Sequence, residues 1–170
     1  MALKPILTIL VGVVLWWSQP QIGGQSLSDQ LPEMLNEAEK QAILKEQKPK
    51  SHVESALKVA EARVKSALML AQNNQMRAAA QDLDAFLALI VYADAYARKA
   101  LVSKNKDRNH CLKRIEQAVF KQSRNLDSIT RALPLESREA AEVQIGEVRK
   151  IRLRAINDLL GQGQVINTPN

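Results

Sequence analysis

Aromatic residues, cysteine, glycine and proline are all scarce in this sequence. It contains one cysteine, six glycines and six prolines, and aromatic residues make up only 4% of the chain. A single cysteine cannot form an internal disulfide, so the fold must be stabilised by packing. Clusters of β-branched and aromatic residues bounded by turn residues, which are typical of strands, are also scarce. These shortages disfavour a disulfide-stapled scaffold and a β-sheet protein.

The motifs that mark common catalytic and cofactor sites are missing as well. The sequence has no paired-histidine spacing, no glycine-rich phosphate loop, no CxxCH haem attachment and no serine nucleophile elbow. Asp82 and Asp84 are two residues apart and cannot share one helix face, which makes them a poor acid/base pair. We therefore expect a protein that is not an enzyme, with no catalytic residues, no cofactor and no metal site.

Alanine, leucine and charged residues are what the sequence has in quantity. Hydrophobic residues account for 46% and charged residues for 25% of 170 residues, which is one ordinary domain's worth of chain. Alanine and leucine are strong helix formers. The composition therefore predicts an all-α protein.

The first residues have the pattern of an export signal. Lys4 precedes an apolar run from Ile6 to Trp17, which is followed by the polar, breaker-rich stretch SQPQIGGQS. A run of about a dozen residues is short for a membrane-spanning helix, which needs about twenty. We interpret residues 1–24 as a cleavable signal peptide and predict a bacterial protein exported to the periplasm or beyond, with no transmembrane helix in the mature chain. An uncleaved membrane anchor is the alternative.

The rest of the chain is predicted to form five helical segments. A shorter leading helix over 28–48, with Asp29 as cap and Pro32 in its first turn, belongs to a leading helix and linker at 25–50. Ser51 and Glu54 have capping-box spacing and predict the start of the second helix and of a bundle domain over 51–160. The remaining helices are expected at about 76–103, 107–132 and 135–160, and residues 161–170 are expected to be a disordered tail. The expected architecture is an antiparallel four-helix-type bundle of long helices with a shorter leading helix. Fusion of the second and third helices across Asn73 and Asn74 is the alternative.

Heptad-like rows of apolar residues predict which faces point inward. The expected core positions include Leu57, Ala60, Val64 and Ala67; Leu83, Leu87 and Ile90; Leu112, Ile115, Val119 and Ile129; Ala141, Ile145, Val148 and Ile156. The stretch AFLALIVYA over 85–93 is apolar on every side, so it is either the central element or a surface for a partner. Asp94 falls within this apolar face, and Arg98, one turn later, is its expected partner.

Positive charge is concentrated in the fourth predicted helix. Residues 104–133 hold eight bases against three acids. The simpler interpretation is a solvated face that keeps the protein soluble. The alternative is a strip for an anionic partner, formed by Lys106, Arg108, Lys113, Arg114, Lys121 and Arg124. Nucleic acid is a disfavoured partner because no stacking aromatics interleave these bases.

Cys111 and one of the two histidines are neighbours in the sequence, but they do not predict a metal site. Adjacent helical residues point about 100° apart, so His110 and Cys111 cannot easily bind one ion together. Cys111 is expected to be a free thiol that packs as a small hydrophobic residue. If exposed, its basic neighbours would lower the pKa of the thiol and permit an intermolecular disulfide and a homo-oligomer. His52 is expected on the surface.

Two long segments resemble a known bacterial domain. They are ALKVAEARVKSALMLAQNNQMRAAAQDLDAFLALIVYADAYARKAL and RIEQAVFKQSRNLDSITRALPLESREAAEVQIGEVRKIRLRAINDLL. Their most specific feature is LDSITRALPLESREA, a helix–Leu-Pro–helix turn. The chain resembles a helical domain of unknown function that is found in exported and membrane-anchored bacterial proteins. The resemblance implies a helical bundle outside the cytoplasm and supplies no catalytic residues.

The expected function is that of a non-catalytic interaction or scaffold module in the bacterial envelope. Its partner would be an unidentified protein or an anionic envelope surface, contacted through the apolar third helix or the basic fourth helix. The alternative is a periplasmic chaperone or hydrophobic-ligand carrier that holds apolar chains between its helices.

Overall fold

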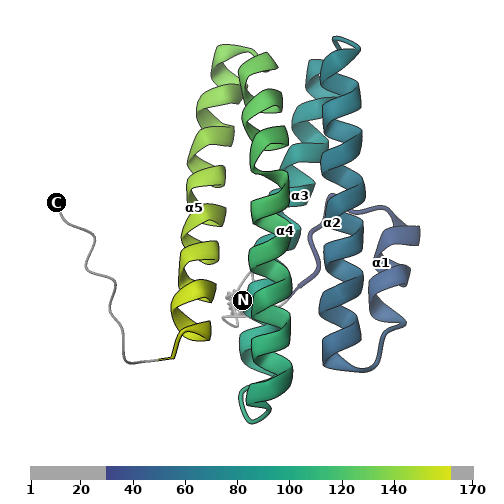
Figure 1. The fold of residues 1–170 in the computed structure, drawn as a ribbon. Coiled ribbons are helices and arrows are strands. Elements are labelled where there is room, and N and C mark those ends of the chain that lie inside the picture. The colour runs from purple at the N-terminus through teal and green to yellow at the C-terminus, as the bar shows by residue number, and fades with distance from the viewer. Residues whose placement is uncertain (1–29, 162–170) are drawn as a thin grey trace, which may run out of the picture.

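The computed structural model describes residues 30–161, and these residues form an all-helical bundle. The helices are α1 (Glu37–Leu44), α2 (Pro49–Gln72), α3 (Met76–Ala100), α4 (Asn105–Ala132) and α5 (Leu135–Leu159). The four long helices lie side by side, and the short α1 packs against α2 (Figure 1). The prediction of an all-α fold is confirmed. The predicted signal peptide at 1–24 lies outside the described residues, as does the predicted tail apart from Gly161.

α3 packs against the three other long helices, α2, α4 and α5, as α4 also does. Its apolar stretch over 85–93 is buried except at Ala88, which is half-buried, and Val91, which is 40% exposed. Most of this stretch is therefore packed inside the bundle, and Val91 is its one exposed residue. The predicted inward rows of α2, α3 and α4 are buried, and Gln122 is buried within the row of α4. In α5, Ile151 is buried where the sequence pattern had favoured the half-buried Ile156.

A break at Asn73 and Asn74 separates α2 from α3, so the alternative of one fused helix is wrong. Asn74 adopts a φ of 58°, in the left-handed region that asparagine tolerates better than most residues. The amide of Gln75 donates to the carbonyl oxygen of Leu70 at 2.9 Å, and the amide of Asn74 donates to that of Ala71 at 3.1 Å. This pair of bonds is a Schellman motif, which satisfies the last carbonyls of α2.

The leading helix is much shorter than predicted. Residues 30–36 are not helical, and α1 begins only after Asn36, whose side chain accepts a hydrogen bond from the Glu39 amide at 2.9 Å. The Glu39 carboxylate accepts a hydrogen bond from the Asn36 amide in return, which completes a capping box. Pro32 therefore lies before the helix and not in its first turn. The apolar spacing of the preceding residues predicted an earlier start of the helix. Asn36, a preferred N-cap residue, sets the actual start.

The start of α2 also differs from the prediction. The helix begins at Pro49, where the missing proline amide costs nothing in a first turn, and no side chain caps it. The predicted capping box of Ser51 and Glu54 is wrong, because both residues lie inside the helix. The Ser55 hydroxyl donates to the carbonyl oxygen of Ala42 at 2.7 Å, which ties α2 to α1.

Candidate functional site

His52 is part of a buried aromatic cluster, which corrects the expectation of a surface residue. Its Nδ1 lies 3.3 Å from the carbonyl oxygen of Glu46, and its Nε2 lies 2.6 Å from the Tyr92 hydroxyl. A carbonyl oxygen can only accept, so Nδ1 carries the proton and the Tyr92 hydroxyl donates to Nε2. The Tyr96 ring stacks on the His52 ring with centroids 4.3 Å apart. Burial lowers the pKa of His52 and raises the pKa of Tyr92 to about 12.

An apolar groove lies next to this cluster, between the segment that precedes α1 and the helices α3 and α5. Its volume is about 420 Å³. Leu31, Pro32, Met34, Leu87, Val91 and Val148 supply most of its apolar lining. We call this feature the apolar groove. Met34 is 51% exposed and Val91 is 40% exposed, so part of the lining faces solvent.

The rim of the apolar groove is polar and partly acidic. Glu33 and Glu147 line it together with Gln30 and Gln144, and both glutamates are exposed. Glu147 accepts a hydrogen bond from Lys150 at 2.7 Å. Unlike the two hollows that hold Arg114 and Arg131, the apolar groove has no basic residue among its lining side chains. The all-round apolarity of 85–93 was the only sequence signal for this groove.

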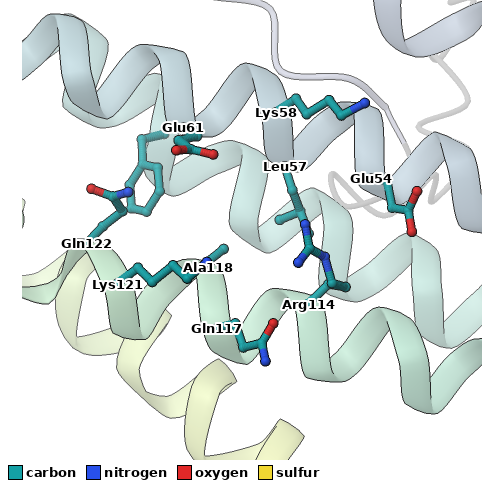
Figure 2. A pocket seen from close by; sticks show the side chains of 10 residues that line it. Glu54, Leu57, Lys58, Glu61, Arg114, Gln117, Ala118, Lys121 and Gln122 are labelled. Atoms are coloured by element: carbon teal, nitrogen blue, oxygen red, sulfur yellow. The ribbon is translucent and has the colours of Figure 1, made fainter.

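A second, smaller cleft separates α2 from α4 and is lined by charged side chains (Figure 2). Its volume is about 60 Å³, enough for water but not for an organic ligand. Glu54 and Glu61 of α2 face Arg114 and Lys121 of α4 across it (Figure 2). A hydrogen bond from Lys65 lowers the pKa of Glu61, and the charges of Lys121 and Arg114 lower it further.

The structure separates the residues of the predicted basic strip. Arg114 and Lys121 line the α2–α4 cleft, whereas Arg108 lines a hollow at the end of the bundle with Arg98 and Asp158. Lys106, Lys113 and Arg124 are exposed on α4. Their spacings of seven and eleven residues place these three on one side of the helix.

Cys111 is a free, fully buried cysteine. Burial, together with the negative charges of Glu54 and Asp107, raises the pKa of its thiol to about 11. The thiol is therefore in the protonated, unreactive form at neutral pH. His110 does not share a site with it, because its Nε2 lies 2.9 Å from the Glu54 carboxylate and joins α4 to α2. This contact across the bundle had no signal in the sequence.

Asp94 is buried and held by two arginines. Its Oδ1 accepts from Nε of Arg98 at 2.9 Å, as the sequence predicted, and its Oδ2 accepts from Nη2 of Arg154 at 2.8 Å. Arg98 also reaches Asp158 at 2.5 Å. These contacts join α3 to α5. They give Asp94 a structural explanation that requires no ligand.

Asp82 and Asp84 point to different helices, as expected from their spacing. Asp82 accepts a hydrogen bond from Arg63 of α2, which also binds Glu39 of α1 at 2.7 Å through Nε. Asp84 interacts with Gln144 of α5, and burial raises the pKa of its carboxyl group. Each aspartate therefore ties α3 to a different neighbour.

Within residues 30–161, no group of three or more His, Cys, Asp or Glu side chains is placed to hold a metal ion. None of the helices in this described part of the chain combines the length and the hydropathy needed to cross a membrane. Comparisons with protein-family models, with curated proteins and with solved structures found no match to this chain. The candidate site consequently rests on the geometry of the apolar groove.

Proposed function

We propose that this chain is a non-catalytic, exported protein whose four long helices form an antiparallel bundle, and that it serves as an interaction module in the bacterial envelope. The apolar groove is the docking site. The observation that carries this proposal is the groove itself, in which an apolar lining of about 420 Å³ stays open to solvent beside a well-filled core. Apolar surface of this kind, bordered by polar residues, is typical of binding sites.

The proposed occupant is an apolar peptide segment of a partner protein that carries a lysine or arginine beside its apolar residues. The apolar part would cover Met34 and Val91, and each of these partly exposed side chains would contribute about 1 kcal/mol when buried. The basic residue would meet Glu33 or Glu147 on the rim. Charge complementarity of this kind favours a particular orientation and rate of association more than affinity.

Two features of the sequence support the proposal that the chain is exported. The apolar run at 6–17 and the breaker-rich stretch after it have the pattern of a signal peptide, and the resemblance to a bacterial envelope domain agrees with it. The absence of catalytic motifs from the sequence favours binding over catalysis.

A hydrophobic-ligand carrier is the second candidate, and the size of the apolar groove favours it. A volume of about 420 Å³ lies in the range of small-molecule sites. The interior between the helices is filled by Leu83, Leu89 and Ile90, among others, so a lipid-like chain would have to lie in the groove. Both candidates therefore predict a ligand in the same place.

Photo-crosslinking in the producing bacterium tests the docking site. A photoreactive residue at Val91 should capture a partner segment, whereas the same residue at Val102, which is 65% exposed in the α3–α4 connection, should not. A synthetic peptide of the captured segment should bind the purified chain and the Val102→Asp control, and should bind the Val91→Asp variant at least tenfold more weakly. Equal capture at both positions would contradict the proposal.

The two candidates differ in which ligand should bind the apolar groove. If a fatty acid binds the purified chain with one-to-one stoichiometry and Val91→Asp abolishes that binding, while no peptide is captured at position 91, the carrier is the correct function. Capture of an apolar segment that carries a basic residue, together with no fatty-acid binding, supports the interaction module.

A further inference from the structure

The outer side of α4 carries a line of exposed basic residues around one exposed aromatic ring. Lys106, Lys113, Phe120, Arg124 and Arg131 follow one another at spacings of seven, seven, four and seven residues. These spacings place all five side chains on one side of an α-helix. All five are exposed, and Phe120 is 60% exposed. We call this set the basic line.

No described acid forms an ion pair with the basic line, although Asp127 and Glu142 line a hollow together with Arg131. Lys106, Lys113, Arg124 and Arg131 form no ion pair with any described residue. Two of the three acids of α4 pair with α5: Glu116 with Arg152 at 2.9 Å and Asp127 with Arg149 at 2.9 Å. The third, Asp107, directly follows Lys106. The arginines of α5 therefore occupy two of the three carboxylates that would otherwise offset the positive charge of α4.

Phe120 is exposed, so packing in the core of the bundle does not explain its position. Its ring lies at the seam between α4 and α5, with the guanidinium carbon of Arg152 4.7 Å from the ring centroid. This cation–π contact holds the ring at the surface and covers one of its faces. An exposed aromatic ring surrounded by lysine and arginine is typical of helices that lie in a membrane interface, where the ring enters the headgroup region and the bases meet lipid phosphates.

We propose that the basic line is a docking surface for an anionic lipid bilayer, on which α4 lies with its axis parallel to the membrane plane. The line runs over about 37 Å, because helical residues rise about 1.5 Å each. Four bases along this length match a surface of lipid phosphates, and Phe120 is the apolar anchor at the middle. This surface is separate from the apolar groove, which lies between α3, α5 and the segment before α1, so a docked partner and a bilayer could be bound at once.

A lipid bilayer is favoured over nucleic acid as the partner because α4 has only one aromatic residue, Phe120. A strand of nucleic acid is bound without sequence preference by successive stacking aromatics, and α4 offers one aromatic residue with one face already covered by Arg152. A bilayer needs only one ring that can enter the interface. The charge of the line alone does not separate the two partners, so the test includes both.

Vesicle sedimentation with the full chain tests the proposal. The chain should bind phosphatidylglycerol-containing vesicles and not vesicles of phosphatidylcholine alone, and high salt should release it. The Lys113→Glu/Arg124→Glu double variant should bind at least about 25-fold more weakly, since the loss of each base near an anionic surface costs about fivefold and the added carboxylates are repelled. The Lys45→Glu/Arg77→Glu variant makes the same change in net charge at exposed positions outside α4 and is the matched control.

A tryptophan reporter then tests the orientation of α4. In difference spectra against the unmodified chain, Phe120→Trp should show a blue shift of its emission on phosphatidylglycerol-containing vesicles. Leu44→Trp, at a residue that is 55% exposed on α1, should show none.

Three results would overturn the proposal. The first is equal loss of binding in the two double variants, which would mean that only the overall charge matters. The second is an unshifted emission of Phe120→Trp on vesicles that the chain does bind. The third is binding to single-stranded RNA, lost in Lys113→Glu/Arg124→Glu, by a chain that does not sediment with the vesicles.

Discussion

Removal of the Asp94 carboxylate should destabilise the bundle more than removal of any paired carboxylate on α4 or α5. The Asp94 side chain is almost fully buried, at 4% exposed, whereas the paired carboxylates described on those two helices are at least 20% exposed. It accepts charge-assisted hydrogen bonds from Arg98 at 2.9 Å and from Arg154 at 2.8 Å. Asp94→Ala would leave both arginines without this acceptor.

The size of the effect follows from the exposure of the two partners. A hydrogen bond to a charged group contributes about 1.5–3 kcal/mol. Arg154 is 57% exposed and regains water when Asp94 is lost, so its contact counts as a surface pair of about 0.5 kcal/mol. Arg98 is 30% exposed and keeps Asp158, so its contact with Asp94 falls at the low end of the charged range. The expected loss for Asp94→Ala is about 2–3 kcal/mol, below the 3–5 kcal/mol of a fully buried pair.

Urea unfolding followed by far-UV circular dichroism measures this free energy. Asp127→Ala is the matched control, because Asp127 pairs with Arg149 at 2.9 Å but is 49% exposed, and its loss should cost less than about 1 kcal/mol. Arg154→Ala should resemble this control, and Arg98→Ala should cost more than Arg154→Ala. If Asp94→Ala is no more destabilising than Asp127→Ala, the argument from burial is wrong.

Three further predictions concern single positions. Gly146→Ala should raise the free energy of unfolding by about 1 kcal/mol, because glycine weakens a helix interior and a Cβ added at Gly146 meets no atom within 4 Å; an unchanged urea midpoint would contradict this. Cys111 should resist a thiol reagent at neutral pH in the folded chain and react rapidly in urea, because the thiol is buried and has a pKa of about 11; fast labelling of the folded chain would show that the α2–α4 side opens. The lowered pKa of His52 means that the unfolded chain binds this proton more readily than the folded chain. The stabilisation linked to His52 is therefore fully present above its unfolded-state pKa of about 6.5 and should be lost as the pH falls below that value. His52→Gln should remove this part of the pH dependence of the free energy of unfolding, measured by urea titrations at several pH values. If the free energy of unfolding of the variant changes with pH as much as that of the unmodified chain, His52 is not the source of the pH dependence.

The helices were largely predictable from the sequence because their signals are local. Leu133 and Pro134 end α4 as predicted, since the residue before a proline avoids the helical region. The break at Asn74 was predicted from two adjacent asparagines, and its left-handed φ explains why the chain can stop there. The predicted start of α1 was wrong. The expected row of apolar residues extends through 31–35, but Asn36 and Glu39 together form the actual cap.

The sites were much less predictable. Asp94 and Arg98 are one turn apart, so their contact was readable from the sequence, but Arg154 is sixty residues from Asp94 and only the packing of α5 on α3 brings it there. His52 looked like a first-turn surface residue, and its burial depends on Tyr92 and Tyr96 from another helix. The apolar groove likewise needs residues 30–34, α3 and α5 together.

The sequence by itself determined that the chain is helical, where its long helices end and which side of each helix points inward, because periodicity, caps and breaks act within a few residues. Only the tertiary structure decided which helix each inward face meets. That choice buried His52 and left Val91 exposed in a groove. Residues far apart in the chain become neighbours through packing, and no local pattern records which ones.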